Sequence, residues 1–257
     1  MGTARFRFYA ELNDFLPGGA GGAEVVRSFQ GSPSVKDQVE ACGVPHTEVD
    51  VILVNGESVG FDHRLKDGDR VSVYPVFEAL DVTPLVRLRP RPLRELRFVL
   101  DVHLGTLARR LRLLGFDAAW SRDAADEALV AVSLAERRVL LTRDRGILKR
   151  KELTHAAAVH ATEPRRQLRE AVERFDLARL AAPFTRCLGC NGTLVSVAKA
   201  DVLERLPPVT RLHYDDFLTC TSCSCVFWWG PHARRLAAIV AEALGPGGAR
   251  SGPGSEL

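Results

Sequence analysis

Four of the chain's six cysteines form two Cys-x-x-Cys pairs, Cys187/Cys190 and Cys220/Cys223, separated by 29 residues. A turn of this kind directs two thiolates toward one point, and two such turns complete the tetrahedral site that zinc prefers. Because four thiolates leave no open coordination position, we expect the zinc to be structural. The glycine within the first pair and Ser224 after the second suit such turns.

Other residues compete for this site. Cys225, His213 and His232 are alternative ligands, and Cys225 lies only two residues beyond Cys223. Disulfide pairing of the cysteines is the other alternative, which the reducing cytosol disfavours. Cys42 lies far from the cluster in sequence, and we expect it to be a core thiol.

Carboxylates follow three successive predicted strands. Asp101 ends the first strand, Asp123, Asp126 and Glu127 follow the second, and Asp144 follows the third. In parallel sheets, ligands bind beyond the carboxyl ends of the strands. Carboxylates gathered there repel one another unless a cation is bound, and they are natural ligands for Mg²⁺ or Mn²⁺.

Helix capping is the simpler explanation for most of these acids. Asp123, Asp126 and Asp144 each stand where a side chain can cap the helix that follows. Asp101, at the end of an apolar strand, is the acid that capping explains least.

Basic residues next to Asp144 predict a rim for phosphate groups, formed by Arg143, Arg145 and Lys149. With a phosphodiester substrate, bound metal ions would activate water and offset charge on the leaving oxygen. Trp228 and Trp229, beside the second cysteine pair, either stack on bases or pack over the zinc core.

The segments that must position these residues alternate from residue 97 onward. Apolar strands are predicted at 98–100, 118–120, 139–142 and 156–161, and helices at 104–114, 125–137, 144–151 and 165–175. This order predicts a mainly parallel sheet with helices on both faces. In the first helix, the apolar residues recur at helical spacing, and we expect Arg109, Arg110 and Arg112 to lie on other faces. A further apolar helix is predicted at 233–244.

Residues 1–78 predict a different unit. Two strands precede a helix over Val35–Cys42, for which Ser34 is the expected cap, and an Asn55-Gly56 turn joins two later strands. Two strands, a helix and a meander follow the β-grasp order.

Composition and charge bound the function. Of 257 residues, 46% are hydrophobic and 26% charged, which excludes disordered, collagen-like and coiled-coil proteins. We find neither an apolar stretch that spans a membrane nor a secretory signal, so we expect a cytoplasmic protein without a membrane partner. Residues 1–85 contain 7 basic residues (Lys or Arg) and 13 acidic residues (Asp or Glu). The remainder of the chain contains 28 basic and 19 acidic residues. The resulting net charges of −6 and +9 indicate two units, of which the basic one can meet a polyanion.

The expected organisation is therefore a β-grasp domain at 1–79, a linker at 80–96, an α/β domain at 97–180, a zinc ribbon with its C-terminal helix at 181–245, and a disordered tail at 246–257.

Several motifs in combination resemble a known family. They are Phe98-Val-Leu-Asp101-Val-His-Leu-Gly105, Leu114-Gly-Phe-Asp117, Leu140-Leu-Thr-Arg-Asp144-Arg, the paired cysteines, and Tyr214-Asp215-Asp216-Phe217. This series resembles the Mut-seven C-terminal family of PIN-like ribonucleases over about 97–232. Residues 3–78, with Arg7-Phe-Tyr-Ala-Glu-Leu12 and Asp67-Gly-Asp-Arg-Val71, resemble the ubiquitin-like β-grasp domain found ahead of it in bacterial members.

The resemblance implies a fold, an activity and a set of residues. The fold would be a β-grasp domain, a PIN-like α/β domain with a parallel sheet and a zinc ribbon. The activity would be Mg²⁺- or Mn²⁺-dependent hydrolysis of single-stranded RNA. Asp101 and Asp144 match the family's acids most clearly, while Asp126 competes with Asp123 and Glu127 for the remaining position.

Two alternatives from other classes remain. One is a non-catalytic RNA-binding adaptor on the same scaffold, and the other is a β-grasp interaction protein whose PIN-like unit binds a protein partner. The β-grasp domain is itself a candidate site for a protein partner. The β-grasp unit also resembles sulfur carriers, but it continues through Val76-Phe77-Glu78 without the Gly-Gly ending that carriers need, so we do not expect carrier chemistry.

Overall fold

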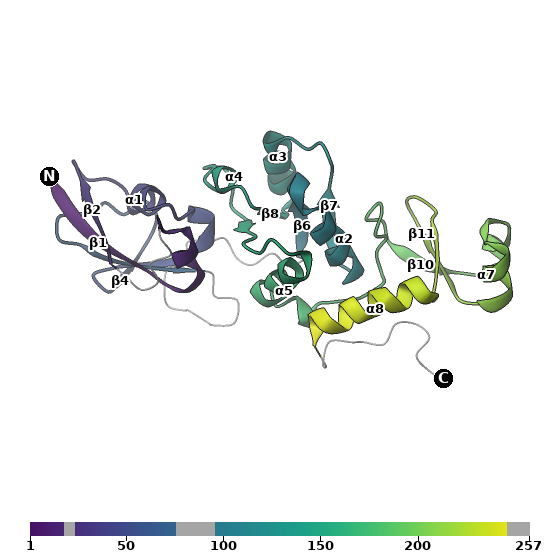
Figure 1. Cartoon of the computed structure of the whole chain (residues 1–257). Helices are drawn as coiled ribbons and strands as arrows, with labels where there is room; N and C mark the ends of the chain where they lie inside the picture. The colour runs from purple at the N-terminus through teal and green to yellow at the C-terminus, as the bar shows by residue number, and fades with distance from the viewer. Residues whose placement is uncertain (18–23, 76–95, 246–257) are drawn as a thin grey trace. The chain divides into compact units, whose positions relative to one another are not determined.

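The computed structural model describes residues 1–17, 24–75 and 96–245 (Figure 1). By their contacts, the described residues form two compact units. One contains those up to residue 75 together with 130–158, and the other contains 96–129 together with 159–245. Residues 18–23, most of the predicted linker at 80–96 and the predicted tail at 246–257 lie outside the described residues.

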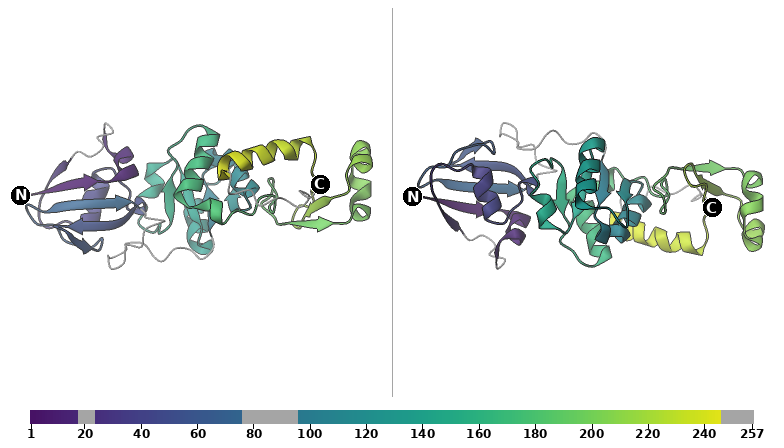
Figure 2. Two further views of the ribbon diagram at one scale, coloured as in Figure 1. Left: turned by 90° about the horizontal axis from the view of Figure 1, so that it is seen from below. Right: turned by 90° about the horizontal axis from the view of Figure 1, so that it is seen from above.

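A mixed five-stranded sheet of order β2-β1-β5-β3-β4 forms the first part of the first unit. Its strands are β1 (Gly2–Phe8), β2 (Val25–Phe29), β3 (Val49–Val54), β4 (Glu57–Val59) and β5 (Arg70–Pro75). β1 runs parallel to β5 and antiparallel to β2, while β3 runs antiparallel to both β4 and β5. Helix α1 (Val35–Ala41) crosses one face of this sheet, which confirms the β-grasp order (Figure 2).

Local sequence signals place the boundaries of these elements. The Ser34 hydroxyl accepts a hydrogen bond from the backbone N–H of Asp37 at 3.1 Å and so caps α1, as predicted. Asn55 and Gly56 connect β3 to β4 with φ angles of +53° and +91°. Two successive positive φ values belong to the hairpin turn whose twist matches that of the strands, and Asn-Gly is its preferred pair. In β1, Phe6 and Phe8 point into the core while Arg5 and Arg7 are exposed, as the alternation predicts.

The second part of the first unit contains β8 (Val139–Thr142), α4 (Arg145–Leu148) and β9 (Ala156–Ala158). β8 pairs in parallel with β9, with Leu140 opposite Ala156. Both α4 and β9 are shorter than predicted. Turn residues follow α4, and a segment without regular structure follows β9. Helix α3 (Asp126–Glu136) leads into β8.

A buried single-turn helix, η3 (His46–Glu48), joins the β-grasp sheet to this second part. The Glu48 Oε1 atom accepts a hydrogen bond of 2.6 Å from the backbone N–H of Ala158. The Thr47 hydroxyl donates to the Leu148 carbonyl at 3.2 Å, and the His46 Nε2 atom lies 3.2 Å from the Leu153 carbonyl oxygen. All three η3 residues are buried, so these bonds are shielded from water and connect segments about 100 residues apart in the chain.

We expect Glu48→Ala to lower the free energy of unfolding by about 2 kcal/mol, because it leaves the buried Ala158 N–H without this acceptor. Chemical denaturation of the purified chain measures the change. Glu57→Ala is the matched control, since Glu57 lies on β4 and is exposed. Equal stability of the two variants would contradict this role for Glu48.

The second unit begins with a parallel pair, β6 (Arg97–Leu100) and β7 (Asp117–Trp120), joined by α2 (Gly105–Leu113). The apolar residues of α2 are buried as their spacing predicts, with Leu107, Ala108 and Leu111 fully enclosed. Helix α5 (Pro164–Arg174) packs against α2, and the long α8 (Pro231–Leu244) packs against α5. The parallel strand pairs and their connecting helices confirm the α/β class.

A three-stranded antiparallel sheet, of order β10-β11-β12, makes up the ribbon. Its strands are β10 (Leu194–Val197), β11 (Phe217–Cys220) and β12 (Val226–Trp228). Between β10 and β11 lie the helical segments α6 (Lys199–Val202), η6 (Leu203–Arg205) and α7 (Pro208–His213), which the sequence did not lead us to expect. They supply Val202 and Leu206 to a small core around Phe217.

Within the described ranges, every helix is too short or too polar to cross a lipid bilayer.

Candidate functional site

The four predicted zinc ligands come together in the ribbon. The Sγ atoms of Cys187, Cys190, Cys220 and Cys223 all lie within 4.8 Å of one another. Two of the separations are 3.7 Å (Cys187 to Cys223) and 3.4 Å (Cys190 to Cys220), far longer than a disulfide bond. A tetrahedral zinc with Zn–S bonds of about 2.3 Å requires sulfur atoms about 3.8 Å apart, so the cluster has the size that zinc needs.

The two cysteine turns have the same backbone pattern. The N–H of Asn191 donates to the Cys187 carbonyl at 3.0 Å, and the N–H of Ser224 donates to the Cys220 carbonyl at 3.0 Å. Asn191 and Ser224, each directly after the second cysteine of its pair, have positive φ angles of 69° and 57°. Both turns therefore present their sulfur atoms in the same way.

This equivalence places Cys225 outside the four-sulfur group. The Cys187 N–H donates to the Gly192 carbonyl, and the Cys220 N–H donates to the Cys225 carbonyl, so Cys225 occupies the position that Gly192 has in the first turn. Its thiol is exposed and lies outside the four-sulfur group, as do the side chains of His213 and His232. Gly192 has no room for a side chain, because an added Cβ would lie 2.7 Å from the Cys220 sulfur.

Protonation of the thiols depends on their surroundings. Burial raises the pKa of Cys187 to about 12, although hydrogen bonds from the backbone N–H groups of Cys190 and Gly189 act to lower it. At Cys220 burial acts in the same direction, but hydrogen bonds from the backbone of Cys223 and Ser222 outweigh it and lower the pKa to about 6. Zinc binds thiolates, so its binding must release the Cys187 proton and weakens as the pH falls. The isolated Cys42 is buried as predicted, and burial raises its pKa to about 11 against the opposing charge of Arg27.

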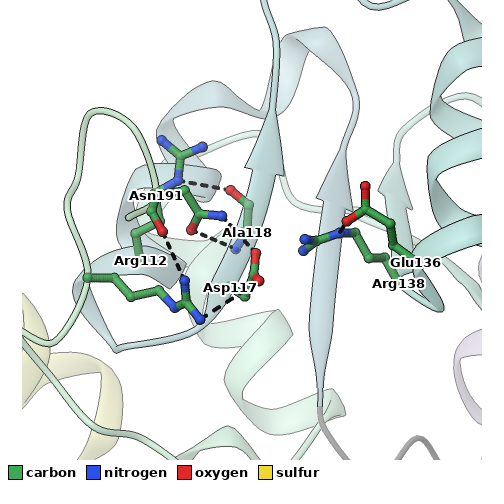
Figure 3. A network of polar contacts seen from close by, with 7 residues as sticks. Arg112, Asp117, Ala118, Glu136, Arg138 and Asn191 are labelled. Carbon is green, nitrogen blue, oxygen red and sulfur yellow. Dashed lines mark hydrogen bonds and ion pairs between the residues drawn. The ribbon is translucent and has the colours of Figure 1, made fainter. Parts of the chain in front are cut away.

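Arg112 ties the first cysteine turn to α2 and β7 (Figure 3). Its Nη1 atom donates to the carbonyls of Leu188 and Gly189 at 3.0 Å and 2.9 Å, and its Nε atom donates to the Ala118 carbonyl at 2.9 Å. The expectation that Arg112 lies on an outer face of its helix was wrong, since only 3% of the residue is exposed. The carbonyls that bury it come from β7 and from a turn 76 residues away.

Asn191 completes this network, again without a sequence signal. Its Oδ1 atom accepts from the Ala118 N–H at 3.1 Å, and its Nδ2 atom donates to Asp117 Oδ1 at 2.7 Å. The guanidinium of Arg186 donates to the Asn191 carbonyl and lies 3.7 Å from Asp117 Oδ2. The first cysteine turn is thus attached to the start of β7. Figure 3 also draws a separate pair, Arg138 and Glu136, in the first unit.

The predicted acids lie in different surroundings. Asp101 directly follows β6 and is only 6% exposed, and its side chain makes no cap bond to the turn η4 (Val102–Leu104) that follows. Asp126 begins α3 and is exposed, with Glu127 beside it, and Asp123 is exposed in the preceding loop. Asp144 follows β8 and caps α4, because its Oδ1 atom accepts from the Gly146 N–H at 2.6 Å. The capping explanation therefore holds for Asp144.

The convergence of these acids at one edge stays a prediction. Asp101 and Asp126 belong to the second unit, whereas Asp144 belongs to the first. Among the described residues, the four cysteines are the group of His, Cys, Asp or Glu whose ligand atoms lie close enough to share an ion. As donors, the three carboxylates have the chemistry that Mg²⁺ and Mn²⁺ require.

Of the three predicted phosphate-binding residues, Arg145 already makes hydrogen bonds within the protein. Its Nη1 and Nη2 atoms donate to the carbonyls of Phe15 and Asp14 at 3.1 Å and 3.0 Å. The guanidinium also lies over the Phe15 ring, 5.1 Å from its centroid. Arg143 and Lys149, which precede and follow it in the sequence, are exposed. The contact with Phe15 is a consequence of the fold that no sequence pattern indicated.

Comparisons with known proteins match both parts of the chain. A family model described as the Mut7-C RNAse domain matches residues 96–240, and one described as Mut7-C ubiquitin matches residues 1–81. No curated protein matches. Among solved structures, the chain is similar to "Putative molybdopterin converting factor, subunit 1" from Pyrococcus furiosus, with 25% identity and a TM-score of 0.24. That match covers 29% of this chain and 98% of the other.

The ribonuclease-family model covers more than half of the chain, including the three predicted acids and all four cysteines of the metal group. The chain therefore belongs to the Mut7-C RNAse domain family and carries a Mut7-C ubiquitin-like domain at its N-terminal end.

Proposed function

We propose that this protein is a Mg²⁺- or Mn²⁺-dependent ribonuclease that hydrolyses phosphodiester bonds of single-stranded RNA. The observation that carries the proposal is the match of residues 96–240 to a ribonuclease family. Asp101, Asp126 and Asp144 would hold the divalent ion, and the structural zinc of the ribbon takes no part in the chemistry.

Each residue has a separate task in this proposal. The bound ion would supply a water molecule of lowered pKa and positive charge near the leaving oxygen. The carboxylates would fix its position: Asp101 from a buried site at the end of β6, and Asp144 through the oxygen that remains when Oδ1 caps α4. The exposed Arg143 and Lys149 would hold the phosphates on either side of the scissile bond.

One observation favours the non-catalytic adaptor instead. The Asp144 carboxylate has a structural task in capping α4, and the neighbouring Arg145 is bound to Phe15 and Asp14. A scaffold that uses both residues for its own packing could bind RNA without cutting it. The β-grasp domain would then recruit a protein partner.

Cleavage of end-labelled single-stranded RNA separates these functions. We expect wild type to cut with Mn²⁺ or Mg²⁺ and not without an added divalent ion, and Asp144→Asn to reduce the rate by about 100-fold or more. Asparagine caps a helix as well as aspartate does, so this variant keeps α4 and removes one negative charge.

Glu152→Gln, which changes an exposed acid of the same unit, is the control that should cut normally. If wild type binds RNA but never cuts it with either ion, the adaptor is the correct function. Full activity of Asp144→Asn would leave Asp144 with its capping role alone.

A further inference from the structure

A groove in the second unit lies between the ribbon, α2 and α8, elements that Figure 1 labels. It has two lobes with volumes of about 540 Å³ and about 470 Å³. Their shared wall is formed by Leu113, Leu188, Phe227, His232 and Leu236. Each lobe has the size of a small-molecule site, and neither is lined by Asp101, Asp126 or a zinc ligand.

The larger lobe, here called the aromatic lobe, contains aromatic side chains that the ribbon core does not use. Val226 and Trp228 pack against the core around Phe217, and Trp228 also lies against Tyr214. Phe227 lies between Val226 and Trp228 on β12 and therefore points to the opposite face of the sheet. Trp229, directly after β12, does not belong to that core either. Trp229 is 41% exposed and contacts the Phe184 ring edge-to-face, with centroids 5.0 Å apart.

Phe184 is held in a backbone conformation that bulky residues rarely adopt. Its φ angle is +62°, and its N–H donates to the Leu113 carbonyl at 3.1 Å. Such strain persists only where the surrounding structure imposes it, and it concentrates at binding sites. Here it places the ring against Trp229 at the wall of the aromatic lobe.

The smaller lobe, here called the arginine lobe, is positively charged. Arg109 and Arg110 of α2 line it together with His232, and no aspartate or glutamate does. Arg109 is exposed, and the Nη1 atom of Arg110 is buried without a hydrogen-bond partner among the described residues. Because that atom has almost no solvent-accessible surface, an anion in this lobe would be held by Arg109 and by the exposed part of Arg110.

The start of α8 adds to this positive field. Its N-cap, Gly230, has no side chain to cap the helix, and Pro231, His232 and Ala233 of the first turn line the aromatic lobe. The N–H groups of a first helical turn have no acceptor within the helix, and the helix dipole is positive there. Arg186 and the exposed Asp216 also line the aromatic lobe, so the excess of positive side chains lies in the arginine lobe. The groove thus combines an aromatic wall with an anion-binding side.

We propose that this groove binds one nucleotide unit of single-stranded RNA, with the base against Trp229 and Phe184 and a neighbouring phosphate at Arg109 and Arg110. An aromatic surface accepts any base by stacking, and the arginines accept the phosphate that every nucleotide carries. The groove would hold the strand at a point other than the proposed catalytic acids. The inference rests on the proposed RNA substrate but not on cleavage.

The test measures equilibrium binding of a fluorescent 12-nucleotide RNA by the full chain without divalent ions, alongside an abasic ribose-phosphate strand of the same length. We expect wild type to prefer RNA by roughly 10-fold and Trp229→Ala to lose that preference, with Trp229→Phe restoring it. Arg109→Gln should weaken binding of both strands and reduce the salt dependence.

Two exposed residues outside the groove give matched controls, Leu212→Ala in α7 and Arg235→Gln in α8, and both should bind like wild type. Zinc content and circular dichroism show that each variant is folded. Wild-type RNA affinity in Trp229→Ala, or equal wild-type affinity for the two strands, would overturn the groove proposal.

Cleavage is scored separately. If wild type cuts RNA but Trp229→Ala binds RNA with wild-type affinity, the ribonuclease proposal stands and the groove proposal is wrong. If wild type never cuts RNA but loses RNA affinity when Trp229 or Arg109 is replaced, the groove proposal stands and the ribonuclease proposal is wrong.

Discussion

Cys187→Ser should abolish zinc binding and unfold the ribbon. A structural zinc contributes about 10–16 kcal/mol of apparent binding energy in small zinc domains, which is more than a three-stranded sheet with one small apolar core can replace. The effect should reach α2, because Arg112 donates to the carbonyls of the turn that Cys187 begins.

Zinc content per chain, measured by mass spectrometry, should fall from one to zero in this variant. Proteolysis should then cut within residues 185–230 while the β-grasp part stays intact. Cys225→Ser is the matched control, since its thiol is exposed and outside the sulfur group. Zinc retained by Cys187→Ser, or lost by Cys225→Ser, would show that the ligand set is different.

Asp101→Asn should reduce RNA cleavage by about 100-fold or more, if the chain is the nuclease that we propose. Asp101 is buried at the end of β6, and asparagine preserves its shape while removing the charge that would hold a cation. RNA binding without divalent ions should stay unchanged, because the groove beside the ribbon does not contain this residue.

The same assay identifies the second acid. We expect Asp126→Asn to lose activity and both Asp123→Asn and Glu127→Gln to keep it. Loss in Glu127→Gln instead would assign the role to the neighbouring residue of α3. Cleavage by Asp101→Asn at the wild-type rate would place the active site elsewhere.

Short-range patterns in the sequence were enough to predict much of the fold and the group of four cysteines. The spacing of the cysteines predicts that the four sulfur atoms meet, because a two-residue gap closes a turn with both sulfur atoms on one side. The helical spacing of Leu107 and Leu111 gives the buried face of α2, and Asn55-Gly56 gives the hairpin. In each case the residues that decide the structure lie within a few positions of one another.

The tertiary structure decided the rest, because the deciding partners are distant in the chain. Arg112 looks like a surface residue in sequence and is buried by carbonyls 76 and 77 residues away. The sequence predicts that Arg145 binds phosphate, yet its guanidinium donates a hydrogen bond to the carbonyl of Phe15, 130 residues earlier. The sequence did not decide whether Trp228 and Trp229 stack on bases or pack over the zinc core. In the structure Trp228 packs against the ribbon core and also lines the groove, whereas Trp229, directly after β12, lies outside that core and contacts Phe184.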